Sequence, residues 1–220
     1  MIFNTSEPTY SFQEFGRTIL SMKGRFIVLD GPDGSGTSLH SKLLAERLTS
    51  ENIPVHLTAE PSNGMIGQQI RPLLASEQDS PSPDALQLLF CADRADHVIK
   101  ELLPALEDGI TVICDRYSLS TLVYGAVLGL DVEWLRSINE PFPQPDHTIF
   151  TLPDYAVCRD RLTRRSSHDA WENDDFQHNI YNEYKRLSDE DPSIILLDTD
   201  GEKAAVSDHL YALLFQEGKE

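Results

Sequence analysis

Residues Phe26-Ile27-Val28-Leu29-Asp30-Gly31-Pro32-Asp33-Gly34-Ser35-Gly36-Thr37-Ser38 decide the fold of this chain. An apolar run with the length of a buried strand leads into a glycine-rich loop. The pattern for a phosphate-binding loop is G-x-x-x-x-G-K-[ST], and Gly31, Gly36 and Ser38 fill three of its four fixed positions. Thr37 stands where the pattern has lysine. The stretch therefore predicts backbone N–H groups and a helix N-terminus around an anion, without the charge that normally reaches the terminal phosphates.

Apolar runs alternate with helical patterns along the rest of the chain, which is typical of a parallel sheet flanked by helices. Strands are predicted at Arg25–Asp30, Val55–Ala59, Thr111–Cys114, His147–Leu152 and Ile194–Asp198. Helices are predicted at Ser38–Thr49, Ile66–Leu74, Asp84–Leu106, Leu119–Leu128, Val132–Ile138, Tyr155–Arg165, Asp175–Leu187 and Glu202–Phe215. The fold class that follows is α/β, a three-layer P-loop NTPase-type fold with a five-stranded parallel sheet.

The composition limits the kinds of partner and the location that we expect for the chain. Its 220 residues carry 18 basic and 36 acidic side chains, and the net charge of −18 argues against a general nucleic-acid binder, which needs a basic face. No apolar run approaches the ~20 residues of a membrane span, and acidic residues interrupt the N-terminus where a signal peptide would be apolar. Cys91, Cys114 and Cys158 show no C-x-x-C spacing, so we expect reduced thiols in a cytoplasmic protein. Apolar residues at helical spacing predict an amphipathic helix over residues 11–22, packed on the domain or on a partner subunit.

Charged residues follow two of the predicted strands. Glu60-Pro61 comes after the second strand, and Asp115-Arg116-Tyr117 ends the third. Ligands bind beyond the carboxyl ends of the strands in open α/β sheets. A carboxylate there suits magnesium, directly or through water, and an adjacent arginine suits bidentate phosphate recognition. Taken alone, an Asp-Arg pair is more often a surface ion pair, but its place after an apolar strand in a chain with a phosphate loop favours a role in binding.

Phe90 and Arg94 are four residues apart in a predicted helix, so they share one helix face. An aromatic ring beside a guanidinium could stack on a base and hydrogen-bond to its edge. The alternative from spacing alone is a core phenylalanine and a surface arginine.

These motifs together resemble the thymidylate kinase family, over about residues 26–200. The resemblance rests on their joint order and spacing: Asp33 within the loop, Glu60-Pro61, Leu89-Phe90-x-Ala92-Asp93-Arg94-Ala95-x-His97, Asp115-Arg116-Tyr117-x-x-Ser120-Thr121-x-x-Tyr124, Pro145-Asp146 and Arg165-x-x-x-Asp169-x-x-Glu172. It implies a single nucleoside-monophosphate kinase domain over residues 25–220, with a lid near residues 164–173. Residues 1–24 are then an N-terminal extension.

The resemblance implies an acceptor site for dTMP. Phe90 would stack on the thymine, Arg94 would hydrogen-bond to its carbonyl edge, and Arg116 would hold the monophosphate. Tyr124 would lie against the sugar and leave no room for a 2′-hydroxyl. The full implied set is Glu60, Phe90, Arg94, Arg116, Ser120, Thr121 and Tyr124.

The resemblance also implies an ATP site with magnesium. The loop residues that would cradle the ATP phosphates are Gly31, Pro32, Asp33, Gly34, Ser35, Gly36, Thr37 and Ser38. Ser38 and Asp115 are the implied magnesium residues. The implied catalytic residues are Asp33, Arg116, Arg164 and Arg165, where the two lid arginines supply positive charge to the phosphates.

The sequence departs from the family pattern in three places. Gly34 stands where some members have arginine, Thr37 replaces the loop lysine, and Ala170 stands where a basic lid residue is common. Lys42 is five residues beyond Thr37, ~7.5 Å further along a helix, and is expected to be solvated. A lid arginine and magnesium could cover the missing cation, because phosphoryl transfer depends mostly on positioning and charge stabilisation.

The expected activity is a kinase that converts dTMP and ATP·Mg²⁺ to dTDP and ADP, with a homodimer as the candidate assembly. One alternative is the same fold acting on another deoxynucleotide or a nucleoside. A second alternative is a non-catalytic nucleotide-binding or regulatory protein that has lost the loop lysine.

Overall fold

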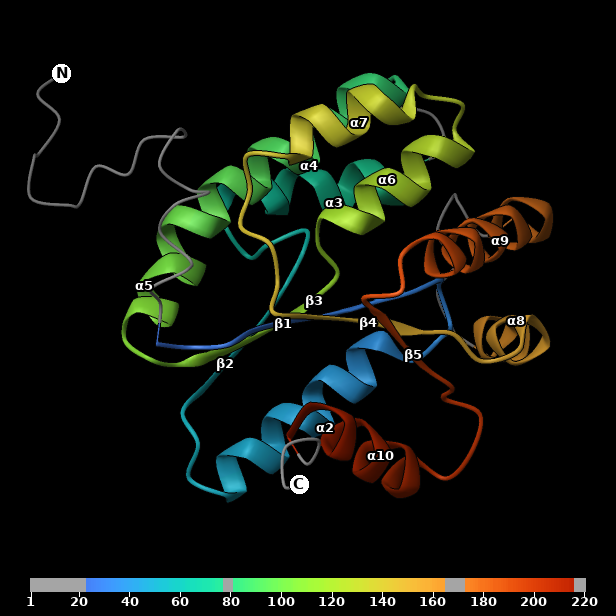
Figure 1. Ribbon diagram of the computed structural model, residues 1–220. Coiled ribbons are helices and arrows are strands. Elements are labelled where there is room, and N and C mark those ends of the chain that lie inside the picture. Colours follow the sequence, from blue (N-terminus) through green and yellow to red (C-terminus); the bar gives the residue numbers. More distant parts are fainter. Residues whose placement is uncertain (1–22, 77–80, 165–172, 216–220) are drawn as a thin grey trace, which may run out of the picture.

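The computed structural model describes residues 23–76, 81–164 and 173–215 (Figure 1). Its centre is a five-stranded sheet in the order β2-β3-β1-β4-β5, and each neighbouring pair is parallel. The strands are β1 (Phe26–Asp30), β2 (Val55–Ala59), β3 (Thr111–Asp115), β4 (His147–Thr151) and β5 (Ile194–Leu197). The predicted α/β class and the five-stranded parallel sheet are confirmed.

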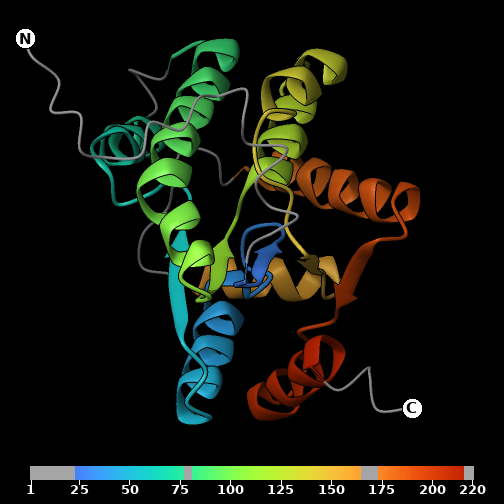
Figure 2. The same cartoon turned by 60° about the vertical axis from the view of Figure 1, so that its left-hand side comes forward.

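Helices cover both faces of this sheet. On one face lie α2 (Thr37–Ser50) and α10 (Lys203–Phe215), which appear below the sheet in Figure 1 and again in Figure 2, in blue and dark red. The other helices are α3 (Met65–Ala75), α4 (Pro83–His97), α5 (Leu103–Glu107), α6 (Ser118–Val127), α7 (Val132–Asn139), α8 (Tyr155–Thr163) and α9 (Asp174–Glu190). Of these, α4, α6 and α7 lie above the sheet in Figure 1, and α8 and α9 lie at one end of it.

The central strand β1 explains why the fold has three layers. All five of its residues are buried, as expected of a strand that is covered on both faces. Because successive side chains point to opposite faces, Phe26 and Val28 join the core beside α4 and α5, whereas Ile27 and Leu29 join the core beside α2 and α10. The apolar run at the start of the loop motif is thus the middle of the molecule.

The predicted helix Asp84–Leu106 is interrupted in the structure. Between α4 and α5 lies a π-helical turn, η2 (Val98–Leu102), in which the Leu103 N–H donates to the Val98 carbonyl five residues back. Pro104 follows at the start of α5 and has no N–H for the regular helical bond. The wider turn fits this break, which the hydrophobic spacing alone does not reveal.

The other predicted elements are present and differ from the observed ones only at their ends. The predicted helix over residues 11–22 and the lid residues 165–172 lie outside the described residues. Among the described helices, none combines the length and the apolar character that crossing a membrane requires.

The strand order creates a crevice next to β1. The chain leaves β1 towards β2 on one side, whereas it leaves the adjacent β3 towards β4 on the other side. Ligands of open α/β sheets bind where the connections diverge in this way, outside the carboxyl ends of the strands. The loops after β1 and β3 therefore form the place to look for a site.

Candidate active site

The loop after β1 has the backbone of an anion cradle. Gly36 precedes α2 with φ 97°, a left-handed conformation that favours glycine. A Cβ on Gly31 would lie 2.5 Å from Thr151 Oγ1, so a larger residue would collide with β4. Both glycines of the motif are therefore required by the geometry, and α2 begins directly behind the loop.

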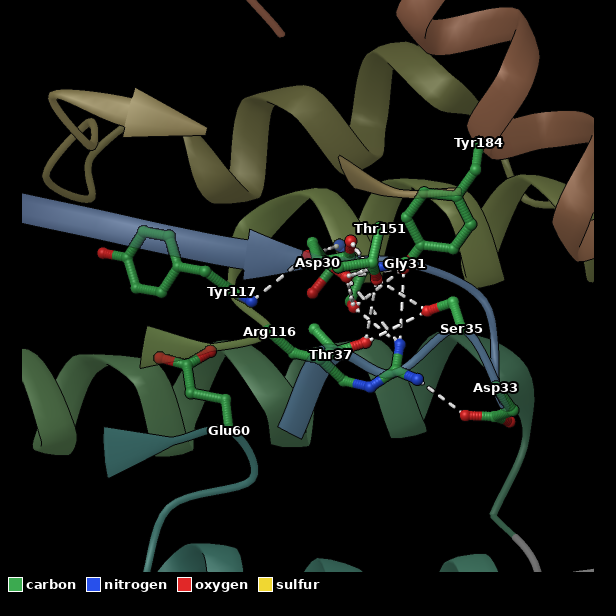
Figure 3. A network of polar contacts seen from close by, with 12 residues as sticks. Asp30, Gly31, Asp33, Ser35, Thr37, Glu60, Arg116, Tyr117, Thr151 and Tyr184 are labelled. Atoms are coloured by element: carbon green, nitrogen blue, oxygen red, sulfur yellow. Dashed lines mark hydrogen bonds and ion pairs between the residues drawn. The ribbon is translucent and has the colours of Figure 1, made fainter. Parts of the chain in front are cut away.

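Thr37 lies in a cluster of neutral hydroxyl groups between the loop and β4. Its side chain is buried, and its Oγ1 lies 3.2 Å from Ser35 Oγ and 3.3 Å from Thr151 Oγ1. Ser35 Oγ and Thr151 Oγ1 are 2.7 Å apart (Figure 3). The next helix lysine, Lys42, is exposed, as the sequence predicts, and the structure pairs it with Glu46.

An arginine that sequence analysis did not single out lies against the same loop. Arg161 of α8 donates from Nη1 to the Gly34 carbonyl at 3.3 Å and from Nη2 to the Thr199 carbonyl at 2.7 Å. Its Nη1 also lies 3.0 Å from Thr199 Oγ1. Arg161 therefore places a positive charge beside the loop, but its donors hold loop carbonyls in position. The helical pattern of residues 155–163 gives no sign of this contact, which depends on how α8 packs.

A buried carboxylate at the end of β1 connects the two strand-end loops. Asp30 is fully buried and accepts hydrogen bonds from the Gly31 N–H at 2.9 Å and the Ser120 N–H at 3.1 Å. It also accepts from Ser120 Oγ at 2.7 Å and from Tyr184 Oη at 2.6 Å. Asp30 thereby fixes the phosphate loop to the start of α6 and to α9.

Arg116 reaches from the β3 loop to the phosphate loop. It adopts φ 69°, which is unusual for a residue other than glycine and is found where surrounding structure imposes it. Its Nη2 lies 2.6 Å from Asp33 Oδ1, and its Nη1 donates to Ser120 Oγ and Tyr184 Oη at 3.3 Å each (Figure 3). On the other side, Gln177 Nε2 donates to Asp33 Oδ2 at 3.1 Å. The two predicted catalytic residues Arg116 and Asp33 are therefore in direct contact.

The two residues predicted to bind magnesium, Asp115 and Ser38, are hydrogen-bonded to each other. The buried Oδ1 of Asp115 has no hydrogen-bond partner among the described residues. Burial raises the pKa of Asp115, while the charge of Arg116 and a hydrogen bond from Ser38 oppose this rise. An unpartnered carboxylate oxygen beside a hydroxyl at a phosphate loop fits Mg²⁺, which takes few protein ligands and several waters or phosphate oxygens. Among the described residues, no group of three or more acidic, histidine or cysteine side chains is placed to hold a metal ion.

A cavity of about 240 Å³ opens beside these loops. All seven residues predicted for the acceptor site line it, together with Asp33 and Asp115. The lining predicted residues are Glu60, Phe90, Arg94, Arg116, Ser120, Thr121 and Tyr124. The fold thus brings together residues that follow β2 and β3 with residues of α4 and α6, which are far apart in the sequence.

Arg94 is held rigidly in the cavity wall. It is 1% exposed, and its Nε donates to Glu60 Oε2 at 2.9 Å. Its Nη2 donates to Thr121 Oγ1 at 3.1 Å, and its Nη1 donates to Asn139 Oδ1. The other Glu60 oxygen lies 3.2 Å from His97 Nδ1. Glu60 therefore acts on the cavity by positioning Arg94.

Tyr124 lines the cavity next to Arg116. Its ring lies 6.4 Å from the ring of Phe176 of α9, and the Arg116 guanidinium lies 5.6 Å from its centroid. Burial raises the pKa of Tyr124, so its hydroxyl remains protonated at neutral pH.

Comparison with known proteins agrees with this arrangement. Residues 29–210 match the thymidylate kinase family. This chain belongs to the thymidylate kinase family.

Curated thymidylate kinases of several organisms are similar to the chain. A probable thymidylate kinase of Pyrococcus horikoshii is 46% identical over 132 residues, which cover 58% of this chain and 64% of the relative. The thymidylate kinase of Caldicellulosiruptor saccharolyticus is 39% identical over 173 residues, covering 76% of this chain and 84% of the relative. That of Exiguobacterium sibiricum is 34% identical over 183 residues, covering 80% and 86%. The chain thus matches just under two thirds of the Pyrococcus relative's length and most of the length of the other two.

The segment predicted as a lid, residues 164–173, is described only at its two ends. Arg164 is exposed and its Nη2 lies 2.8 Å from Asp160 Oδ2, one helical turn back. Arg165, Asp169, Ala170 and Glu172 lie outside the described residues. The catalytic roles of Arg164 and Arg165 stay predictions.

The structure adds site residues that the motifs of the thymidylate kinase family did not single out for this chain. Besides Arg161 they hold the predicted residues in place, and they are Asp30, Asn139, Gln177 and Tyr184. His97 belongs to the quoted motif, and the structure gives it a role beside Glu60. Asp30 could have been found, because it is a charged residue at the end of an apolar strand. The others come from helices in which polar residues are common, and only the packing distinguishes them.

Proposed function

We propose that this chain transfers the γ-phosphoryl group of ATP to dTMP, giving dTDP and ADP. The observation that carries this proposal is the direct contact between the two sites. Arg116 lines the acceptor cavity, and its guanidinium contacts Asp33 of the phosphate loop at 2.6 Å. An acceptor phosphate held by Arg116 would therefore lie next to a donor phosphate held by the loop.

The chain's own residues account for binding and orientation. Phe90 and Arg94 would hold the base, Tyr124 would border the sugar, and Arg116 would exchange its contact with Asp33 for the acceptor phosphate. The acceptor phosphate is itself an anionic nucleophile, so no general base is required. Catalysis then depends on alignment and on stabilisation of charge, as in phosphoryl transfer generally.

Magnesium fits this proposal as the cofactor. Bound with ATP, it neutralises phosphate charge, and Asp115 and Ser38 are the residues that would hold it, directly or through water. Replacing Asp115 by Asn removes the carboxylate from that position. We expect the Mg²⁺ concentration for half-maximal activity to rise about ten-fold or more in this variant.

The loss of the loop lysine changes the distribution of charge at the donor site. Thr37 contributes only a buried hydroxyl, and the donors of Arg161 are directed to carbonyl groups. The remaining attraction for ATP would come from the loop N–H groups, the start of α2, magnesium and the lid arginines Arg164 and Arg165.

Release of ADP with a panel of acceptors tests the proposed function. The panel is dTMP, dUMP, dCMP, dGMP and thymidine, with ATP and Mg²⁺ in each case. We expect the highest kcat/KM with dTMP. Binding of dTMP without turnover would favour a regulatory nucleotide-binding protein, and a higher kcat/KM with another acceptor would favour a related kinase.

A homodimer and a cytoplasmic location also stay proposals. The three cysteines are free and buried, which fits a reducing compartment. Analytical ultracentrifugation of the full chain tests the assembly, and a sedimenting mass of one chain at micromolar concentration would contradict the dimer.

A further inference from the structure

Gln87 of α4 has no role in the site described so far, yet it lines the acceptor cavity. Its side chain is 1% exposed, and neither Nε2 nor Oε1 has a hydrogen-bond partner within the described parts of the chain. Buried amides are nearly always hydrogen-bonded, because removal from water without a partner is unfavourable. An unpaired amide in a cavity wall therefore points to a partner that a ligand supplies.

Gln87 lies on the wall of the cavity that is predicted to hold the base. Gln87, Phe90 and Arg94 are spaced by three and four residues, which places them along one face of α4. Leu74, Leu86 and Leu128 add an apolar lining to the cavity. The charged residues Asp33, Asp115 and Arg116 come instead from the strand-end loops. A flat base with a polar edge suits the α4 wall, and a phosphate suits the loops.

The hydrogen-bonding capacity of Arg94 is largely taken by the protein. Its Nε, Nη1 and Nη2 each already donate to an acceptor: Glu60, Asn139 and Thr121. The guanidinium has no acceptor, so it cannot bind a base N–H group. Recognition of such a group needs a different side chain, and the carboxamide of Gln87 provides both an acceptor and a donor.

We propose that Gln87 is a specificity-determining residue that reads the imide edge of the acceptor base. Its Oε1 accepts from the base N3–H, and its Nε2 donates to the adjacent base carbonyl. This inference rests on the proposed function, because it assumes that the cavity takes a nucleoside monophosphate. A thymine or uracil base offers this N–H and carbonyl pair side by side.

Arg94 and Gln87 together would discriminate against cytosine. A carboxamide alone could rotate to match the N3 acceptor and the amino group of cytosine. Arg94 is fixed as a donor by its contacts with Glu60 and Asn139, so an amino group facing it would set donor against donor. The 5-methyl group of thymine would be sensed by the apolar lining and not by Gln87.

Equilibrium binding of nucleotides tests the proposal with Gln87→Met, which keeps the size of the side chain and removes its hydrogen bonds. Gln69→Met on the exposed face of α3 is the matched control. The ligands are dTMP, dUMP and dTMP methylated at N3, and each is measured with the full-length protein. Each neutral hydrogen bond changes affinity by about 2- to 10-fold, so the loss of two bonds predicts a rise of about 4- to 100-fold in Kd for dTMP.

The ligand series separates hydrogen bonding from shape. Wild-type protein should bind N3-methylated dTMP at least about ten-fold more weakly than dTMP, and Gln87→Met should abolish most of that preference. The preference for dTMP over dUMP should stay unchanged. Gln87→Glu gives a second variant: a carboxylate keeps the bond to N3–H and loses the donor, so its loss of dTMP affinity should be smaller.

The ligand-free protein provides an independent readout. If Gln87 serves a ligand, Gln87→Met should leave the midpoint of thermal unfolding unchanged or raise it, because an unpaired buried amide is removed. A dTMP affinity within two-fold of wild type, an unchanged preference against N3-methylated dTMP, or a lower midpoint without ligand would each overturn the proposal.

Wild-type protein that binds dTMP but forms no dTDP would contradict the proposed function and leave the assignment of Gln87 standing. Wild-type protein that binds none of the ligands would contradict both.

Discussion

Asp30 and Asp33 lie three residues apart, and their surroundings give them different tasks. Asp30 is fully buried and its oxygens are occupied by donors from three elements, so it is structural. Asp33 is partly exposed at the cavity, and its two oxygens are held by Arg116 and Gln177. A ligand can replace the contacts of Asp33 with Arg116 and Gln177, because Asp33 is accessible from the cavity. The motif predicted Asp33 as a functional residue, and the structure adds the network that orients it.

Arg116→Lys tests the acceptor-phosphate position. Lysine keeps the positive charge but loses the planar fork that can bind two phosphate oxygens. A charge-assisted hydrogen bond is worth about 1.5–3 kcal/mol, so kcat/KM for dTMP should fall about 10- to 100-fold. The KM for ATP should change little, and Arg136→Lys on the surface of α7 is the control. Equal kinetics for wild type and Arg116→Lys would refute the assignment.

His40 should make the stability of the protein depend on pH. It is 2% exposed, and burial, followed by the charges of Arg161 and Lys203, lowers its pKa below 6.5. Well above pH 6.5 the histidine is neutral in both the folded and the unfolded chain, so its contribution to the free energy of unfolding does not change with pH. As the pH falls below 6.5 towards the lower folded pKa, the unfolded chain takes up the proton first and the folded state loses stability.

His40→Gln should therefore reduce this loss of unfolding free energy between pH 7 and pH 5. A single proton contributes at most about 1.4 kcal/mol for each pH unit. The exposed His209→Gln is the control, and urea unfolding at a series of pH values is the measurement. An identical pH profile for wild type and His40→Gln would show that the proton uptake lies elsewhere.

At the scale of elements, α4 joins the core to the site. Cys91 packs in the core, whereas Gln87, Phe90 and Arg94 line the cavity. The sequence predicts the shared face of Phe90 and Arg94, because residues four apart adjoin on any helix. It does not predict that Asn139 of α7 lies against Arg94, because that depends on the packing of two separate helices. The sequence does not predict the π turn η2 either, because its apolar residues are spaced as in an ordinary helix.

Glu60→Gln tests the buried ion pair that links β2 to α4. Both partners are nearly inaccessible, and Arg94 Nη2 lies 2.8 Å from Glu60 Oε2. Removal of one buried charge leaves the other unpaired, so the free energy of unfolding should fall by about 3–5 kcal/mol. The exposed pair Lys42–Glu46 supplies the control, because Glu46→Gln should change the free energy of unfolding by less than about 1 kcal/mol. Similar urea midpoints for both variants would contradict this account of the site wall.

At the scale of the whole molecule, the sequence predicts the framework better than the site. Buried strands such as Phe26–Asp30 are evident from their apolar runs, and glycine positions fix the loop that follows. The seven residues predicted for the acceptor site line one cavity, whereas Thr37, Ser38 and Arg164 do not line it. Gln87, Arg161 and Tyr184 could not be predicted, because a polar helix residue becomes functional only through the neighbours that the tertiary fold provides.

The net charge of −18 should make the whole molecule sensitive to salt. Repulsion among carboxylates disfavours the compact state, and 0.1 M salt screens charges beyond about 10 Å. The midpoint of thermal unfolding should therefore rise between 0.01 and 0.5 M KCl, by about 2–4 °C for each kcal/mol gained. A falling midpoint would show that surface ion pairs such as Arg47–Asp208, at 2.6 Å, outweigh the repulsion.

Transfer of label from γ-labelled ATP tests most directly whether a loop with Thr37 in place of lysine supports phosphoryl transfer to dTMP. The wild-type chain is incubated with labelled ATP, Mg²⁺ and dTMP, and the products are separated. We predict that the label appears in the β-phosphate of dTDP in a one-to-one ratio with ADP. Label found only in ATP, or released as inorganic phosphate while dTMP stays bound and unchanged, would contradict the assignment of this chain as a dTMP kinase.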